Sequence, residues 1–235
     1  MSIRLVALSD THGNLERIQI PDGDILLHAG DFCFHVGTPQ ELEKEFKALS
    51  KFPHKHKCVI AGNHDFPCQD IPQFAEQIAF ENGLNYLEDS GCVIEGLNIY
   101  GSPWTPWFLD WAFNFQNGDL DQERRYFNAI PDDTNVLITH GPPRNMLDRT
   151  PDHYERMGRN VGSGPLLHRV LDLPELYLHV FGHIHASRGA YNATSRKTST
   201  MFCNASVCTE RYKPINKPYV IDFDSETKKI TVVSE

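Results

Sequence analysis

The chain has 235 residues, of which 40% are hydrophobic and 23% are charged, and its formal net charge is −9. A protein of this size buries a core without disulfides or structural zinc, and we expect one domain over residues 1–235. The acidic balance argues against a long nucleic-acid partner, because such binding depends on Lys and Arg. No apolar run approaches the roughly 18 residues of a membrane span, so we expect no membrane partner.

The six cysteines indicate the cellular compartment. None stands in a CxxC pair, and several lie in apolar sequence, as Cys58 does before Val59 and Ile60. Disulfide-built proteins are usually shorter and richer in cysteine. We therefore expect buried free thiols and a cytoplasmic protein. The apolar N-terminal segment, residues 1–8, is too short for a signal peptide and is typical of a buried strand.

Apolar runs and helix signals alternate along the first half of the chain. Strands are expected at three nearly continuous apolar runs, residues 3–8, 25–29 and 57–61. A helix is expected at 39–49, where Thr38 is a suitable N-cap and Pro39 suits the first helical position. Another helix is expected at 71–81, with Gly83 just beyond its end.

The second half of the chain adds strands with short connections. Strands are expected at residues 92–95, 97–101, 136–139, 177–181, 200–203, 219–223 and 230–233. Helices are expected at 121–129 and 165–173. This order of elements predicts an α/β protein in which two sheets pack face to face with helices outside them.

Two long segments, residues 103–118 and 144–164, lack clear periodicity and are expected as loops. The first carries six aromatic residues, Trp104, Trp107, Phe108, Trp111, Phe113 and Phe115. Aromatic side chains mostly fill cores or fix long loops, and this is the favoured interpretation of residues 104–115. The alternative is that some of these rings stack on a nucleotide base.

Five strand ends carry side chains that can bind metals. They are Asp10-Thr11-His12, Gly30-Asp31, Gly62-Asn63-His64-Asp65, Thr139-His140-Gly141 and Gly182-His183-Ile184-His185. Because ligands gather beyond the carboxyl ends of strands in sheets of this kind, we expect these side chains at one rim. Each motif alone is common, but their conjunction at strand ends predicts a site for two divalent cations.

The types of side chain indicate the metals and the reaction. A mixed set of imidazole, carboxylate and amide ligands favours Mn, Fe, Zn or Co over Ca. We expect two divalent ions, with Mn foremost and Fe, Zn, Co or Mg as alternatives, and Asp31 as the bridging ligand because it lies centrally in the set. Two cations about 3.5–4 Å apart clamp phosphate oxygens, which predicts hydrolysis of a small phosphoester.

The other histidines match no metal motif. His28 lies inside an apolar run and is expected in the core, while His54 and His56 stand among three lysines and are expected on a solvated face. No metal is assigned to these three, nor to His35, His153, His168 and His179.

The five motifs together resemble those of the calcineurin-like metallophosphoesterases, and they span residues 10–185. Further segments are similar to the metallophosphoesterase-domain-containing (MPPED-type) subfamily. They are Tyr100-Gly101-Ser102-Pro103-Trp104-Thr105-Pro106-Trp107, Trp111-Ala112-Phe113-Asn114, Thr139-His140-Gly141-Pro142-Pro143 and Asn204-Ala205-Ser206-Val207-Cys208. Some members lack one histidine of the last metal motif, whereas this chain keeps both His183 and His185.

The resemblance implies a four-layer α-β-β-α sandwich of two mixed sheets, with the metals at strand ends. It places Asp10, His12 and His185 on the first metal. It places Asn63, His140 and His183 on the second, with Asp31 as the bridge. By the same resemblance, His64 stabilises the phosphate and protonates the leaving group, and Asp65 orients its ring.

The expected function is a dinuclear phosphodiesterase that hydrolyses small phosphodiesters, cyclic nucleotides among them, by attack of a metal-bound hydroxide. One alternative is a metal-dependent phosphomonoesterase, whose doubly charged substrate benefits from cations such as Arg144 and Arg159. Another is a metal-binding module without catalysis, because a fold does not fix a function. The sequence leaves the oligomeric state open.

Overall fold

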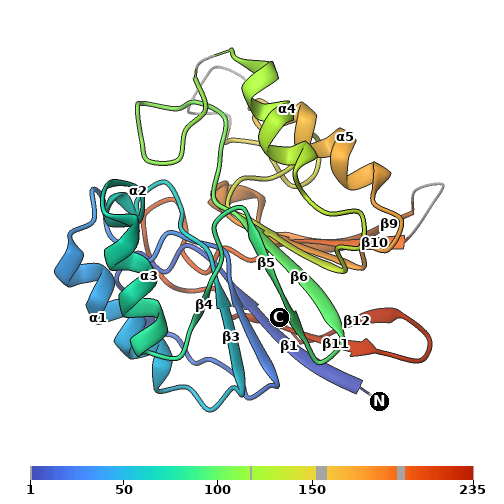
Figure 1. The fold of residues 1–235 in the computed structure, drawn as a ribbon, viewed down its shortest axis with the longest axis horizontal. Helices are drawn as coiled ribbons and strands as arrows, with labels where there is room; N and C mark the ends of the chain where they lie inside the picture. The colour runs from blue at the N-terminus through green and yellow to red at the C-terminus, as the bar shows by residue number, and fades with distance from the viewer. Residues whose placement is uncertain (1, 117, 152–157, 195–198, 235) are drawn as a thin grey trace.

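Two six-stranded sheets pack face to face, and helices cover the outer face of each (Figure 1). The computed structural model describes residues 2–116, 118–151, 158–194 and 199–234. Within them, no helix is long and apolar enough to cross a bilayer. The layering confirms the expected α-β-β-α sandwich.

The first sheet has the strand order β12-β11-β1-β2-β3-β4. Its parallel strands are β1 (Ser2–Leu8), β2 (Ile25–His28), β3 (His56–Val59) and β4 (Asn85–Tyr86). The antiparallel strands β11 (Tyr219–Asp224) and β12 (Lys229–Ser234) extend one edge. The helices α1 (Pro39–Ser50), α2 (Phe66–Asp70) and α3 (Pro72–Glu81) lie on its outer face (Figure 1).

The second sheet has the order β5-β6-β7-β8-β10-β9. Its parallel strands are β6 (Leu97–Ser102), β7 (Val136–Thr139), β8 (Leu178–Phe181) and β10 (Ser199–Asn204). The edge strands β5 (Ser90–Ile94) and β9 (Gly189–Thr194) are antiparallel. The helices α4 (Leu120–Asn128) and α5 (Gly164–Asp172) cover its outer face (Figure 1).

The central strands are buried on both faces, as their continuous apolar sequences predict. Along β1, Leu5 and Ala7 contact the core between the sheets, whereas Val6 and Leu8 contact the core under α1–α3. A third core lies under α4 and α5 and includes Phe127. Because both faces are packed, the register of these strands is fixed, and so is the position of the residues that follow them.

Every strand and helix expected from the sequence is present, with ends that differ by at most two residues. The N-cap is confirmed, because the Thr38 hydroxyl accepts a hydrogen bond from the Glu41 N–H at 3.2 Å. The elements without a sequence prediction are short or lack buried residues: α2 has five residues, β4 has two, the 3₁₀ helices at Leu15–Arg17 and His185–Ser187 have three each, and β9 is an edge strand in which no residue is buried. Such elements have no apolar periodicity to reveal them.

Two expectations about polar residues have different outcomes. The cysteines are free thiols, and all but the half-buried Cys92 are buried, as expected. The solvated face expected at His54 is wrong, because His54 is 2% exposed and Lys57, 8% exposed, donates its Nζ to the His54 carbonyl at 2.9 Å. Lys57 belongs to β3, whose two faces are covered, so its alkyl chain is buried with the strand.

Candidate metal centre

The five motifs lie beyond the carboxyl ends of strands from both sheets. Asp10 follows β1, Asp31 follows β2 and Asn63 follows β3, while His140 follows β7 and His183 follows β8. Their side chains meet at the junction of the two sheets, where groups of potential ligand atoms lie within 4.8 Å of one another. Parallel pairing within each sheet puts these strand ends at the same edge.

The first group of ligand atoms comes from Asp10, His12 and His185. The His185 Nε2 lies 3.2 Å from the Asp10 Oδ1 and 3.2 Å from the His12 Nε2. Asp10 is fully buried, and His12 is 2% exposed. One carboxylate and two imidazoles therefore converge on one point.

The second group comes from Asn63, His140 and His183. The Asn63 Oδ1 lies 2.8 Å from the His140 Nε2 and 2.7 Å from the His183 Nδ1. Asp31 connects this group to the first, because its Oδ2 lies 3.3 Å from the His140 Nε2 and 3.7 Å from the His12 Nε2. The donor set fits two divalent cations of the kind that accept both nitrogen and oxygen.

Backbone carbonyls fix the orientation of three of the imidazoles. Each accepts a hydrogen bond from Nδ1: the Cys33 carbonyl from His12 at 3.1 Å, the Ala29 carbonyl from His140 at 2.8 Å, and the Thr209 carbonyl from His185 at 3.1 Å. Since a carbonyl only accepts, each Nδ1 carries a proton, and each Nε2 is the nitrogen that faces the centre. Hydrogen bonds of this type set the tautomer in metal sites.

The backbone at the centre is strained. Asp10, His12, Asp31 and His183 have φ values of 57°, 43°, 58° and 67°, which lie in the left-handed region. Such conformations are costly for residues with side chains and persist only where the surroundings fix them. Here backbone hydrogen bonds do so, from the Asp10 N–H to the Gly30 carbonyl at 2.9 Å and from the His12 N–H to the Asp31 carbonyl at 3.0 Å.

Two glycines are required by close approach. A Cβ at Gly62 would collide with the Asp31 carboxylate and the His140 ring, and a Cβ at Gly182 would collide with the Asp10 carboxylate. Glycine at these two positions therefore lets the backbone approach the ligand side chains closely.

Carboxylates and imidazoles influence one another's ionisation. Burial opposes the charge on Asp31, but His140 and His64 outweigh burial and hold the pKa of this carboxyl well below its usual value. Burial also lowers the pKa of His140, but Asp31 and Asp10 outweigh it and raise that pKa to about 9. Burial lowers the pKa of His183 to about 3, so its imidazole is neutral at pH 7. The carboxylates thus remain ionised and attract positive charge to the centre.

The role expected for Asp65 is corrected by its contacts. The His64 Nδ1 donates to the His35 carbonyl at 2.7 Å, so this carbonyl orients the ring. The fully buried Asp65 carboxylate instead accepts four backbone N–H bonds, from Asp31, Phe32, Cys33 and Gly62, at 2.8–3.3 Å. Asp65 therefore fixes the two turns that carry Asp31 and Asn63.

Sequence reasoning overlooked several residues that support the centre. The Ser206 hydroxyl donates to the Asp10 Oδ2 at 2.6 Å, and the Ser206 N–H donates to the Asn204 Oδ1 at 3.2 Å. The signal was present, because Asn204-Ala205-Ser206 follows an expected strand as the metal motifs do. Tyr212 was also overlooked. Its ring centroid lies 4.8 Å from that of His12, but the surrounding sequence is polar and has no motif.

The core position expected for His28 is confirmed. His28 is fully buried, and its Nε2 lies 3.2 Å from the Thr11 hydroxyl. His179 is also buried, and its Nε2 lies 2.8 Å from the Thr139 hydroxyl. His168 is exposed on α5, and His153 lies outside the described residues.

A cavity of about 520 Å³ lies over the centre. Its lining includes Asp31, Asn63, His64, His183 and His185, so candidate ligands and a candidate acid face the same space. Of the two arginines considered for phosphate contacts, Arg159 belongs to this lining. Arg144 is exposed and is absent from it.

A family model of the calcineurin-like phosphoesterases matches residues 3–187. The chain belongs to this family. Metallophosphoesterase domain-containing protein 1 of Homo sapiens is 41% identical over 240 residues, a match that covers 93% of this chain and 70% of that protein. A UPF0046 protein of Caenorhabditis elegans is 35% identical over 237 residues, covering 96% of this chain and 77% of its own.

Solved structures agree on the fold of this calcineurin-like phosphoesterase. The Thermus thermophilus protein TT1561 aligns over 99% of this chain and 98% of its own with a TM-score of 0.64 and 12% identity. A 5'-nucleotidase precursor from the same organism aligns over 100% of this chain and 53% of its own, with a TM-score of 0.53 and 11% identity. Family membership makes the protein a metal-dependent hydrolase of phosphoesters.

The contact at Gly62 generates a prediction. Gly62→Ala should displace Asp31 and His140, so we expect at least one metal per chain to be lost and activity to fall at least about tenfold. Gly164→Ala is the control, because a Cβ there meets nothing within 4 Å. Metal content by inductively coupled plasma mass spectrometry and folding by circular dichroism check both variants. Full metal content in folded Gly62→Ala would contradict the assigned geometry.

Proposed function

We propose that this phosphoesterase is a phosphodiesterase that hydrolyses small phosphodiesters with two divalent cations, Mn foremost. The observation that carries the proposal is the position of the Asp31 carboxylate, whose Oδ2 lies 3.7 Å from the His12 Nε2 and 3.3 Å from the His140 Nε2. A shared carboxylate of this kind supports a paired centre over a single metal.

The proposed ligands follow the two groups. Asp10, His12 and His185 would hold one cation, Asn63, His140 and His183 would hold the other, and Asp31 would contact both. Bound at these positions, the cations would supply charge neutralisation for the phosphate and lower the pKa of a water. The protein contributes rigid placement, because the ligand residues are buried or half-buried and the rings of His12, His140 and His185 are held by backbone carbonyls.

His64 is the proposed proton donor to the leaving group. Its Nδ1 is bonded to the His35 carbonyl, so its Nε2 is the nitrogen available to the cavity, 4.0 Å from the Asp31 Oδ2. The indole of Trp111 packs on the ring with a centroid distance of 4.2 Å. The ring is thus fixed on two sides. An alkoxide leaving group needs a proton as the P–O bond breaks, and imidazolium donates one near neutral pH.

A phosphomonoesterase is the second candidate, favoured by one observation. Arg159 belongs to the cavity lining, and a guanidinium there adds the charge that a dianionic monoester requires. The acidic Glu210 belongs to the same lining and works against a second negative charge on the substrate. We therefore keep the diester as the proposal, and matched aryl esters decide between the two.

The proposal predicts the result of a metal titration. Metal-stripped protein should be inactive, and activity on bis(p-nitrophenyl) phosphate should return until two equivalents of Mn²⁺ are bound. We expect the diester to exceed p-nitrophenyl phosphate about tenfold or more in kcat/KM. A faster monoester would establish the second candidate. Two bound metals without turnover of any phosphoester would instead indicate a binding module and contradict the proposal.

The role of His64 predicts a dependence on the leaving group. His64→Ala should keep two metals yet lose about 10²–10⁴-fold in kcat on alkyl diesters, the range of general acid catalysis. With a p-nitrophenyl leaving group the loss should be far smaller, since that oxygen leaves without a proton. The control is His168→Ala on the exposed face of α5. An equal loss on both substrates would exclude the proton donor. Loss of a metal would show that His64 is a ligand, since it shares a group with His12 and Asp31.

A further inference from the structure

The walls of the cavity over the centre differ from its floor. Outside the candidate ligands, one wall is formed by loop residues, namely Pro106, Trp107, Phe108, Leu109 and Trp111. The lining also includes Val161, Ile184 and Tyr212. Beyond the floor, the charged side chains of the lining are Arg159 and Glu210, which carry opposite charges. A polar, ionic floor therefore lies beneath largely apolar walls.

The loop that forms the first wall is fixed by other parts of its own sequence. The Trp104 Nε1 donates to the Asp89 Oδ2 at 2.7 Å, and Phe113 and Phe115 are each 1% exposed. The Ala112 N–H donates to the Asn63 carbonyl at 3.1 Å, which ties the loop to the turn of a candidate ligand. Packing thus accounts for Trp104, Phe113 and Phe115, as the sequence favoured. It does not account for the tip.

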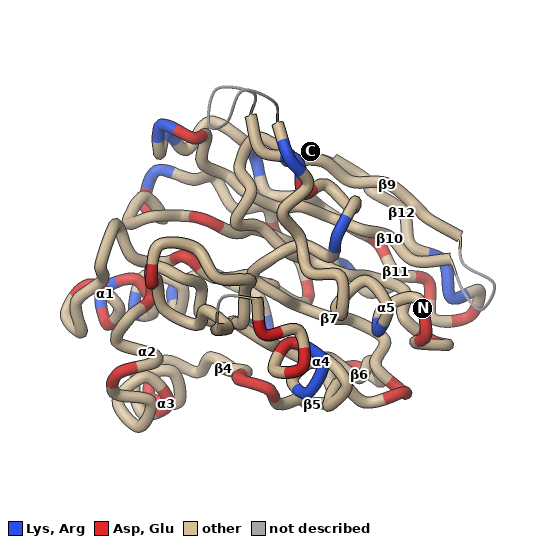
Figure 2. Tube along the Cα trace, turned by 90° about the horizontal axis from the view of Figure 1, so that it is seen from above, with Lys and Arg blue, Asp and Glu red and all other residues tan. Residues whose placement is uncertain are grey.

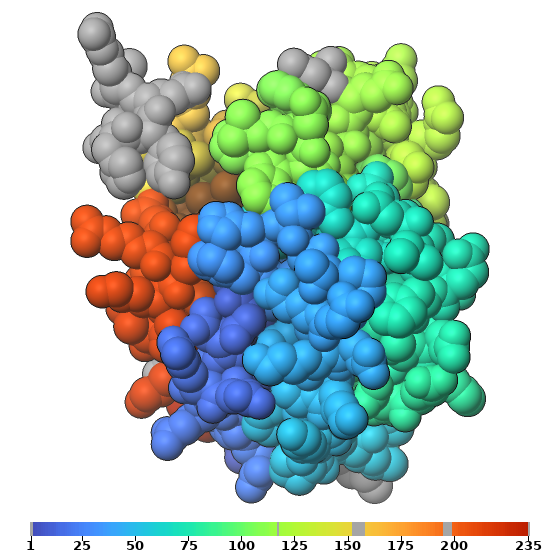
Figure 3. Space-filling model, turned by 90° about the vertical axis from the view of Figure 1, so that its left-hand side faces the viewer, coloured from blue at the N-terminus to red at the C-terminus, as the bar shows by residue number. Residues whose placement is uncertain are grey.

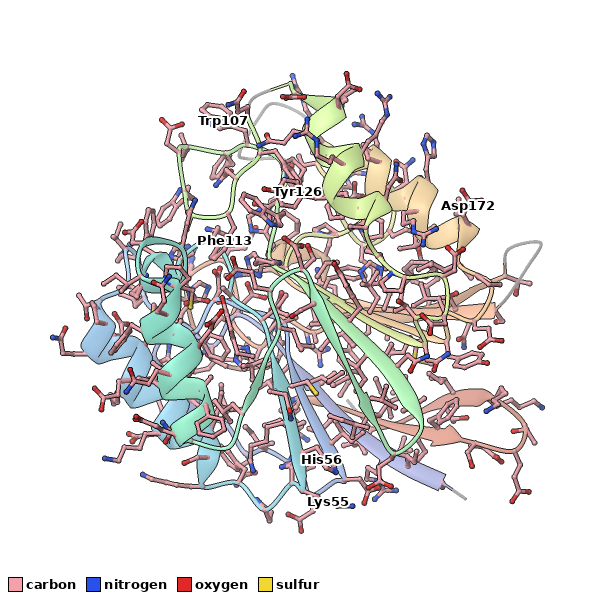
Figure 4. All side chains as sticks on the ribbon, in the orientation of Figure 1. Lys55, His56, Trp107, Phe113, Tyr126 and Asp172 are labelled. Atoms are coloured by element: carbon pink, nitrogen blue, oxygen red, sulfur yellow. The ribbon has the colours of Figure 1, made fainter. Side chains whose placement is uncertain are left out.

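The tip of the loop, defined as Trp107, Phe108 and Leu109, stays open to solvent. These consecutive residues are 41%, 49% and 65% exposed. Phe113 lies beside α2 at the base of the loop, whereas Trp107 lies at its far end (Figure 4). The Trp107 Nε1 donates to the Asp110 Oδ1 at 2.6 Å, so the polar edge of the indole is satisfied and its faces are available. Consecutive exposed apolar residues beside a cavity mark a binding surface.

The tip adjoins the opening of the site. On the face shown in Figure 3, blue surface from the N-terminal part of the chain lies between green surface from its middle and orange surface from its C-terminal part. Charged residues of both signs are interspersed along the trace, and much of the trace through the sheets carries neither (Figure 2). Because the floor of the cavity is ionic and its walls are largely apolar, a substrate with its phosphate at the floor would have its remaining groups against apolar side chains.

We propose that the substrates are phosphodiesters with an alkyl group, which lies against the tip and the apolar wall. This inference rests on the proposed phosphodiesterase activity. An alkyl group has no polar atoms to satisfy, so each methylene moved from water to the wall favours binding. A nucleobase has several donors and acceptors, and burial against these side chains would leave some unpaired at a cost in affinity.

Mixed esters of p-nitrophenol measure this contact directly. In p-nitrophenyl alkyl phosphates, water attacks phosphorus and the bond from phosphorus to the aryl oxygen breaks. The p-nitrophenolate departs with the electron pair, the water releases a proton to solvent, and an alkyl phosphate remains. Because the leaving group is constant from methyl to hexyl, the change in kcat/KM reports contacts of the alkyl chain. A fully buried methylene gives about a fourfold gain, and we expect about two- to fourfold per methylene on this half-open wall.

Variants of the tip locate the effect. Trp107→Ser and Phe108→Ser should each lower the gain per methylene below that of the unmodified protein, and the double variant should bring it close to one. Phe80→Ser is the matched control, because Phe80 is an exposed phenyl group, 85% accessible, on α3 and away from the cavity lining. It should leave the gain per methylene unchanged.

Three results would overturn the inference. One is a flat chain-length series in the unmodified protein. Another is a gain that survives in the double variant. The third is a preference for a nucleotide ester: a kcat/KM for thymidine 5'-(p-nitrophenyl) phosphate that exceeds that for the hexyl ester in the unmodified protein but not in Trp107→Ser. This result would assign the tip to base stacking.

A binding measurement separates this inference from the proposed function. If no ester turns over, the phosphodiesterase proposal fails. Calorimetric affinities of methyl- to hexylphosphonate for the Mn-loaded protein then decide the apolar contact. Affinity that rises with chain length in the unmodified protein and in Phe80→Ser, but not in the double variant, supports the contact. Equal affinities along the series overturn it.

Discussion

The buried carboxylate of Asp65 is the contact on which the site depends. It accepts four backbone N–H bonds and so joins the turn after β2, which carries Asp31, to the turn after β3, which carries Asn63. A carboxylate at 0% exposure is stabilised only when its oxygens are hydrogen-bonded, and these N–H groups meet that need. These hydrogen bonds hold two loops from neighbouring strands together. The joined loops and the packed strands below them fix the positions of the candidate metal ligands.

Strain and close approach complete the arrangement. Left-handed backbone at Asp10, His12, Asp31 and His183 turns these side chains inward immediately after their strands. Glycine at 62 and 182 leaves room for the carboxylates of Asp31 and Asp10. The cores on both faces of the two sheets hold the strand ends rigidly enough to keep the strain. The fold thus brings buried carboxylates and imidazoles together at one site.

The sequence predicted the features that have a periodic or local signal. Continuous apolar runs marked the central strands, Thr38 and Pro39 marked the start of α1, and polar motifs after the strands marked the convergence of ligands. It did not predict β9, in which no residue is buried, or the burial of His54 and Lys57, which neighbouring elements impose. The sequence also did not predict the contacts of Asp65, because three of its four N–H donors lie over 30 residues away in the chain. In the aromatic loop, Trp104, Phe113 and Phe115 are packed whereas the tip is exposed. The sequence could not distinguish these two sets, because the difference arises from tertiary contacts.

We propose two cations, one on either side of Asp31. Diffraction from crystals grown with excess Mn²⁺, measured at the manganese absorption edge, tests it most directly. We predict two anomalous peaks about 3.5–4 Å apart, one bound by Asp10, His12 and His185 and the other by Asn63, His140 and His183, with Asp31 contacting both. A single peak, or two peaks of which neither contacts Asp31, would contradict the account.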